Sequence, residues 1–263
     1  MLEIRGAAPG LLDDPLLLEV GGAAPSSALV WRGRFRDDDG FVWRAAAARS
    51  EWLSTAWVPA KATAGPVAAL RSLRPVDVDV RVEAPDGAAA SRTVTRRLID
   101  EGVRVRRWRD AVAGTLHLPA SPTGAAILID ATTAPVPRPT RPEAPDADAG
   151  PGTPAAAAVA PEAARDADVL AQAPLLAAAL LASRGVLVLV VTGGRGADPV
   201  AAAQEQLAAV PGAAERVRTF GAADIPLPAG IGLRGEDQPG AVARAAAWDA
   251  LLSRLGARPR AER

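Results

Sequence analysis

Residues 76–84, VDVDVRVEA, carry the clearest structural signal in the chain. Their four valines alternate with charged residues, which is the pattern of a β-strand with one buried and one solvent-facing side. Upstream, ALVWRGRFR (28–36) and FVWRAAAAR (41–49) flank DDDG (37–40), a polar turn that suits a hairpin rather than a calcium loop. Short strands at this spacing, without helical runs between them, predict an antiparallel β-sandwich.

The second half of the chain follows an alternating α/β pattern. A helix rich in alanine and leucine leads into the apolar strand VLVLVV (186–191), and a further helix is expected over 199–210. The chain closes with a predicted helix over 239–255, with Gly256 in the position of a C-terminal cap. These elements predict a small sheet covered by helices.

The chain of 263 residues is therefore expected to form two domains, residues 1–110 and 111–263. Residues 134–168 interrupt the second domain with a proline- and alanine-rich insertion. Proline recurs there too often for a helix or a sheet, and few side chains could anchor a core. The insertion is predicted to be disordered.

Composition limits the partners that the chain can be expected to bind. Thirty basic residues balance 30 acidic ones, so no global attraction to nucleic acid or an anionic membrane is expected. Without cysteine and with a single histidine, the chain cannot form disulfides, thiolate sites or a zinc ligand set. The apolar window 173–192 is interrupted by SRG and fits a helix and a strand better than a membrane span. We see no signal peptide, and we expect a cytoplasmic protein without a cofactor.

Several segments in order carry a resemblance to a known family: FRDDDGFVW (35–43), TVTRRLIDEGVRVRRWRDAVAGTLHLP (93–119), LLASRGVLVLVV (180–191) and AAAWDALLSRLGA (245–257). The chain resembles the acyl-CoA thioesterase and bile-acid-CoA:amino-acid N-acyltransferase family. The resemblance implies an immunoglobulin-like N-terminal domain followed by an α/β-hydrolase domain. It also implies action on acyl-CoA thioesters through a serine or cysteine nucleophile, a histidine and an aspartate.

The catalytic parts of that family are missing from the sequence. There is no G-x-S-x-G elbow to present a nucleophile, and DATTAPVP (130–137) replaces the expected glycine-rich loop. Ala223 and Asp224 stand where the family's glycine and histidine would be. The sequence therefore predicts a shortened, degenerate family member without thioester hydrolase activity. It would bind an acyl or CoA-like ligand, or a protein partner.

Asp198 stands at or near the position of the family's acid. An aspartate directly before Pro199 also suits a helix N-cap, and we favour that interpretation. The alternative is an active thioester hydrolase or acyltransferase with a rebuilt site, in which Asp198 and Asp224 form a carboxylate pair. Two close acids would raise one pKa and could act as acid and base. Two unrelated surface acids are the simpler explanation.

Three further features have a structural and a functional interpretation. Ser183 ends a helix and precedes a strand, the reverse of a nucleophile elbow, so we expect it to be scaffold. His117 lies in the strand segment TLHLP with no serine or acid beside it, and we expect it to be at the surface or packed rather than catalytic. The run VRVRRWRD (103–110) could stack on RNA bases or contact a CoA phosphate, but we favour a solvated sheet face.

Overall fold

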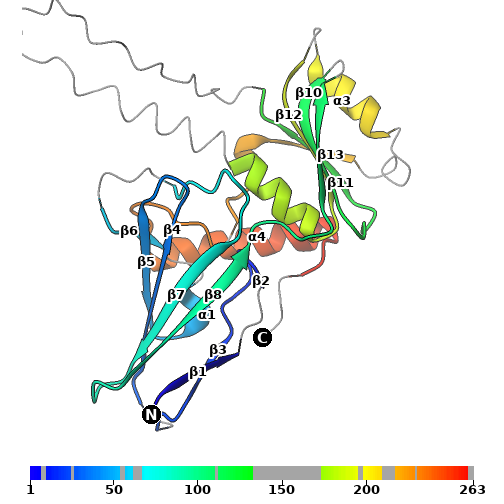
Figure 1. The fold of residues 1–263 in the computed structure, drawn as a ribbon. Coiled ribbons are helices and arrows are strands. Elements are labelled where there is room, and N and C mark those ends of the chain that lie inside the picture. The colour runs from blue at the N-terminus through cyan, green and yellow to red at the C-terminus, as the bar shows by residue number, and fades with distance from the viewer. Residues whose placement is uncertain are drawn as a thin grey trace, which may run out of the picture.

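The computed structural model describes residues 1–6, 10–24, 27–53, 57–61, 67–109, 112–132, 173–194, 198–208, 217–228 and 230–259. This part of the chain is mostly β-sheet with few helices (Figure 1), which is compatible with the predicted β-sandwich domain. The insertion expected to be disordered, residues 134–168, lies outside the described residues. None of the described helices is long and apolar enough to cross a membrane.

The N-terminal half forms a six-stranded sheet in the order β2-β8-β7-β4-β5-β6. Its strands are β2 (Gly10–Leu11), β4 (Val30–Arg36), β5 (Val42–Ala47), β6 (Val58–Pro59), β7 (Val76–Glu83) and β8 (Ala89–Arg97). All neighbours are antiparallel except β2 and β8. A separate antiparallel pair consists of β1 (Glu3–Gly6) and β3 (Leu18–Gly21), and a short helix, α1 (Ser50–Leu53), follows β5.

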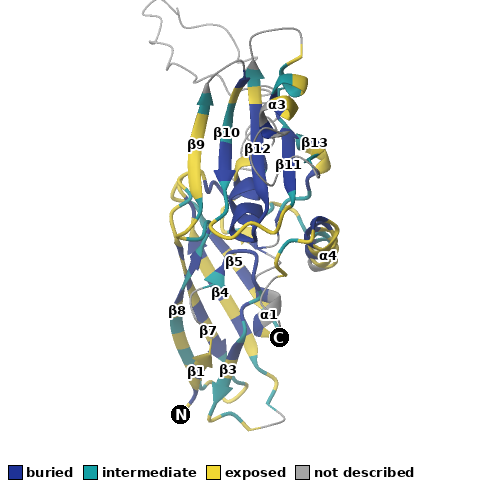
Figure 2. Ribbon diagram, turned by 90° about the vertical axis from the view of Figure 1, so that its right-hand side faces the viewer, coloured by how far each residue is buried: buried dark blue, intermediate teal, exposed yellow. Residues whose placement is uncertain are grey.

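The alternation predicted from residues 76–84 is confirmed in β7. All four of its valines are buried, whereas Asp77, Asp79 and Arg81 are exposed on the other side (Figure 2). The inner side of the sheet is filled by aromatic rings. Phe35 lies 4.9 Å from Trp57 in an edge-to-face contact and 6.4 Å from Trp43, measured between ring centroids. Such pairs add specific geometry to the apolar area that they bury.

The turn DDDG between β4 and β5 forms the predicted hairpin. The carboxylate of Asp37, which is buried, accepts hydrogen bonds from the backbone N–H groups of Asp39, Phe41 and Ala69 and from Trp43 Nε1 at 2.8–3.2 Å. Asp37 thus fixes the turn and anchors an indole of the core. These hydrogen bonds give the turn a structural role.

A five-stranded mixed sheet, in the order β13-β11-β12-β10-β9, forms the second half. Its strands are β9 (Arg104–Arg109), β10 (Val112–Leu118), β11 (Ala126–Asp130), β12 (Leu187–Gly194) and β13 (Val217–Gly221). β11 is parallel to β12 and β13, and β10 is antiparallel to β9 and β12. Because β9 belongs to this sheet, the chain passes from the first sheet to the second within residues 98–103, whereas the predicted domains divide between residues 110 and 111.

Helices cover both faces of the five-stranded sheet. On one face, α3 (Pro199–Ala208) packs on a small apolar cluster. The helix over 173–183 and α4 (Gln238–Leu255) join the other face to the aromatic core of the six-stranded sheet. The C-cap predicted at Gly256 is present, with a φ of 60°. Asp237 caps the other end of α4 by accepting from the Gly240 N–H at 2.8 Å.

A buried ionic cluster links the two ends of the chain. It contains Asp13 and Asp14 from the turn between β2 and β3, Arg96 from β8 and Arg184, which follows the helix over 173–183. Trp248 of α4 donates its indole N–H to Asp13 at 2.8 Å. Two arginines and two aspartates leave the cluster formally neutral, which is the condition for burying charge.

Candidate functional site

Ser183 has both of its hydrogen-bonding functions occupied by the backbone. Its hydroxyl donates to the Ala179 carbonyl at 2.8 Å and accepts from the Asp100 N–H at 2.8 Å. The side chain is buried at the joint between a helix and β12. No imidazole contacts it among the described residues. These contacts describe a residue that links two segments of backbone, as expected for scaffold.

His117 is packed inside the protein, with only 1 % of its surface exposed. It lies opposite Val188 of β12 and Val105 of β9. Burial lowers the pKa of His117 from 6.5 to about 4. Neither ring nitrogen has a hydrogen-bond partner in the described part of the chain. A neutral imidazole without an acid beside it cannot take part in a relay of the serine-hydrolase kind.

Asp198 and Asp224 each bind the backbone of their own segment. The Asp198 carboxylate accepts from the N–H groups of Val200 and Ala201 at 3.0 and 2.9 Å, so it caps α3. Asp224, at the end of the 3₁₀ turn Ala222–Asp224, accepts from the Gly221 N–H at 3.1 Å. Within the described chain the two carboxylates make no hydrogen bond to each other, and no group of His, Asp and Glu that could hold a metal ion is found there.

The two aspartates nevertheless lie at related places in the sheet. Asp224 follows β13 and Asp198 follows β12, and the strand between them, β11, ends at Asp130. Asp130 is occupied by the next turn, since it accepts from the N–H and hydroxyl of Thr132 at 2.9 and 2.6 Å. Each of three neighbouring parallel strands therefore ends in or precedes an acid at the same edge of the sheet.

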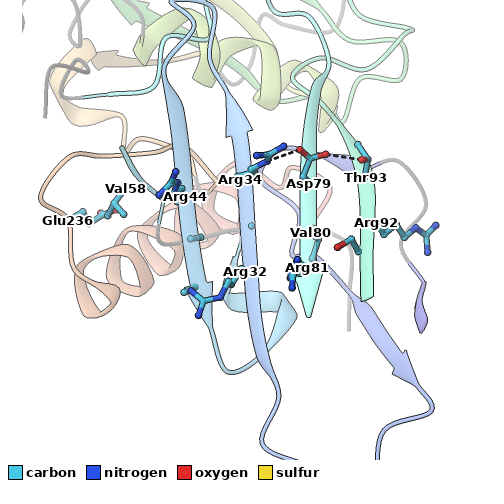
Figure 3. A pocket seen from close by; sticks show the side chains of 14 residues that line it. Arg32, Arg34, Arg44, Val58, Asp79, Val80, Arg81, Arg92, Thr93 and Glu236 are labelled. Carbon is cyan, nitrogen blue, oxygen red and sulfur yellow. Dashed lines mark hydrogen bonds and ion pairs between the residues drawn. The ribbon is translucent and has the colours of Figure 1, made fainter. Parts of the chain in front are cut away.

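A different site lies on the open side of the six-stranded sheet (Figure 3). A hollow of about 1010 Å³ extends over β4, β5, β7 and β8. We call its charged floor the arginine face, which consists of Arg32, Arg34, Arg44, Asp79, Arg81 and Thr93. Alternation along these strands directs the side chains of this face away from the core.

The strand register places like charges side by side on the arginine face. Arg34 of β4 lies directly opposite Arg44 of β5, and Arg32 lies directly opposite Arg81 of β7. Like charges in direct cross-strand pairs are unfavourable. The arrangement therefore needs anions, from the protein or from a ligand, to balance it.

The protein supplies anions to three of these four arginines. Arg34 Nε donates to Asp79 Oδ2 at 2.9 Å, and Glu83 accepts from Arg32 and Arg81 at 3.2 and 2.9 Å. Hydrogen bonds, first from Thr93 and then from Arg34, lower the pKa of Asp79, and Arg32 does the same for Glu83, so both acids stay ionised.

Arg44 is the exception on this face. It is exposed and makes no hydrogen bond or ion pair with any described residue. It also borders a second hollow of about 460 Å³ beyond the hairpin turn, which is lined by two more cations, Arg36 and Lys61. The acids that line the two hollows are engaged elsewhere: Asp79 pairs with Arg34 at 2.9 Å, Asp39 with Arg71 at 2.6 Å and Glu236 with Arg244 at 2.7 Å. Among the described residues, Arg44 therefore has no anion paired with it.

Sequence reasoning did not find this site. The sequence analysis treated VWRGRFR (30–36) only as a hairpin strand and gave its alternating arginines no functional interpretation. Their functional interest comes from cross-strand neighbours 10 to 49 positions away, since Arg34 faces Arg44 and Arg32 faces Arg81. Only the register brings these charges together.

Comparison with known proteins assigns no family, because no protein-family model and no curated protein matches the chain.

Proposed function

We propose that the chain is a non-catalytic, thioesterase-like protein that binds a CoA-like, phosphate-bearing ligand on the arginine face. The observation that carries this proposal is the cross-strand pair of Arg34 and Arg44, in which Arg44 has no anion of its own among the described residues. A phosphate oxygen pair matches the donor fork of a guanidinium and would relieve the repulsion between the two cations.

The surroundings of the pair support a ligand larger than an inorganic ion. The hollow has the volume of sites that hold drug-sized ligands and cofactors. Ser91 and Thr93 add hydroxyl groups at its floor, and Val58 adds an apolar wall. The three-layer arrangement of the second half fits the truncated α/β-hydrolase domain that the family resemblance implies, and the first half would be its immunoglobulin-like companion.

Calorimetric titration with CoA and with dephospho-CoA tests the binding. We expect Arg44→Ala to weaken CoA binding at least about tenfold, the loss of one charged hydrogen-bonded contact, while the free energy of unfolding of the unliganded protein does not fall. Arg74→Ala is the matched control, because Arg74 is exposed but lies outside the hollow. Wild-type protein that gives no binding heat, or an Arg44→Ala variant that binds CoA as tightly as wild type, would refute the proposal.

One observation favours a second candidate, an enzyme with a rebuilt site. Asp130, Asp198 and Asp224 lie at the carboxyl edge of three neighbouring parallel strands, which is where open α/β sheets bind their ligands. In this alternative, Asp198 and Asp224 would act as acid and base on an acyl-CoA thioester.

Hydrolysis of a panel of acyl-CoA thioesters separates the two proposals. We expect no turnover by the wild type, and a loss of about 1 kcal/mol in the free energy of unfolding for Asp198→Ala, because the cap of α3 is removed. Asp198→Asn is the matched control, since asparagine caps a helix but cannot exchange a proton. Turnover that both variants abolish would establish the enzyme instead, with Asp224→Asn showing whether the second acid takes part.

A further inference from the structure

The strand β9 (Arg104–Arg109) forms an open edge of the five-stranded sheet. In the described part of the chain it has a neighbour on one side only, β10 (Figure 2). An edge strand directs the N–H and C=O groups of every second residue away from the sheet, where another extended segment can pair with them. The edge is six residues long, enough to hold several such pairs.

The side chains of this edge are basic on both faces of the sheet. Arg104 and Arg106 lie opposite Leu118 and Leu116, so they share the face covered by α3, whereas Arg107 lies on the other face. All three arginines are exposed, and none makes a hydrogen bond or ion pair with a described residue. The sequence analysis favoured one solvated sheet face, and the structure places exposed arginines of this strand on both faces.

The same margin of the sheet has buried polar atoms without partners. Trp108 Nε1 and both ring nitrogens of His117 are buried and make no hydrogen bond within the described chain. Next to His117, the apolar side chain of Val105 is 43 % exposed. Nearly all buried polar groups of a protein core are expected to be hydrogen-bonded. This margin of the sheet, with unpaired polar atoms and an exposed valine, lacks the contacts that a neighbouring segment would provide.

We infer that β9 binds an acidic, extended peptide segment of a partner protein as a sixth strand of this sheet. The peptide backbone would pair with the free edge, and its carboxylates, on both faces, would pair with Arg104 and Arg106 on one side and Arg107 on the other. A second copy of β9 would bring arginine against arginine, so the same charges that attract an acidic strand oppose self-association. A partner peptide would form backbone N–H···O=C hydrogen bonds with β9. A nucleic acid has no peptide backbone and cannot form this ladder.

Fluorescence anisotropy with the full chain tests the inference. The probe is a labelled ten-residue peptide in which pairs of adjacent glutamates alternate with threonine and valine, because adjacent residues of a strand face opposite sides. A second peptide has the same sequence but carries an N-methyl group on every amide, which keeps its charge and removes the ladder donors from both of its edges. Oligouridylate of matched length tests simple polyanion binding.

The expected result is saturable binding of the first peptide and at least about tenfold weaker binding of the N-methylated peptide. The charge-reversal variant Arg104→Glu/Arg106→Glu should weaken binding at least as much, whereas Arg74→Glu, which lies outside β9, should not. Equal binding of both peptides, tighter binding of oligouridylate, or an unchanged affinity of the charge-reversal variant would each overturn the inference. A circular dichroism spectrum that matches wild type shows that each variant is folded.

Discussion

Replacing Arg184 with alanine is expected to lower the free energy of unfolding by about 3–5 kcal/mol. The Arg184 guanidinium is buried and donates through Nη2 to Asp13 at 2.9 Å and to Asp14 at 2.6 Å. Burial lowers the pKa of Arg184, but Asp13 and Asp14 outweigh that effect, so its pKa lies above the ordinary value. Without the cation, Asp13, whose side chain is fully buried, would lose its main counter-charge.

The loss should be large because Arg184 also joins distant parts of the chain. Its Nη1 donates to the Pro259 carbonyl at 2.6 Å, in the segment after α4. Asp13 in turn holds the Trp248 indole. One substitution therefore loosens the N-terminal turn, the helix over 173–183 and the segment after α4 together.

Urea unfolding, followed by tryptophan fluorescence, measures the effect. Arg184→Lys keeps the charge but cannot reproduce the two-pronged contact, so an intermediate loss is expected. Arg32→Ala is the control for deleting a paired arginine, because Arg32 is exposed and a surface ion pair such as the one with Glu83 adds little to stability. If Arg184→Ala were no more destabilising than Arg32→Ala, the cluster would not stabilise the fold as described.

Local patterns in the sequence were sufficient for most individual elements. The valine alternation of residues 76–84, the DDDG turn and the C-cap of α4 at Gly256 each depend on neighbours in the chain, and the structure contains all of them. The N-cap role of Asp198 is of the same kind, because its partners are two and three residues away.

Long-range pairings could not be found in the same way. Arg184 contacts Asp13 across 171 positions, and no local pattern marks either residue as buried and charged. The spacing of short strands placed RVRRWR (104–109) in the first domain, whereas the structure pairs this strand at the edge of the second sheet. The candidate ligand site and the candidate docking edge both depend on strand register. Each consists of arginines without an opposite charge beside them, and the register decides which residues lie side by side.

The single histidine makes stability sensitive to mild acid. We expect the free energy of unfolding to fall by about 3 kcal/mol between pH 6.5 and pH 4 through His117 alone. The unfolded chain takes up the proton as the pH falls through 6.5, whereas the folded chain takes it up only near the lowered pKa of about 4. The contribution of neutral His117 to the free energy of unfolding is therefore fully present above pH 6.5. It declines as the pH falls from 6.5 to 4 and does not change further below pH 4.

His117→Leu provides the matched control, because leucine has a similar volume and does not titrate. The variant should lose the His117 component of the pH dependence, while acids such as Asp79 and Glu83 titrate equally in both proteins. At pH 7 it should be at least as stable as wild type, since two buried nitrogens without partners are replaced by carbon. Urea unfolding at pH 7, 6, 5 and 4.5 measures the difference between the two proteins. A difference that stays constant over this range would show that the imidazole is hydrated or hydrogen-bonded, which contradicts the apolar packing on which the prediction depends.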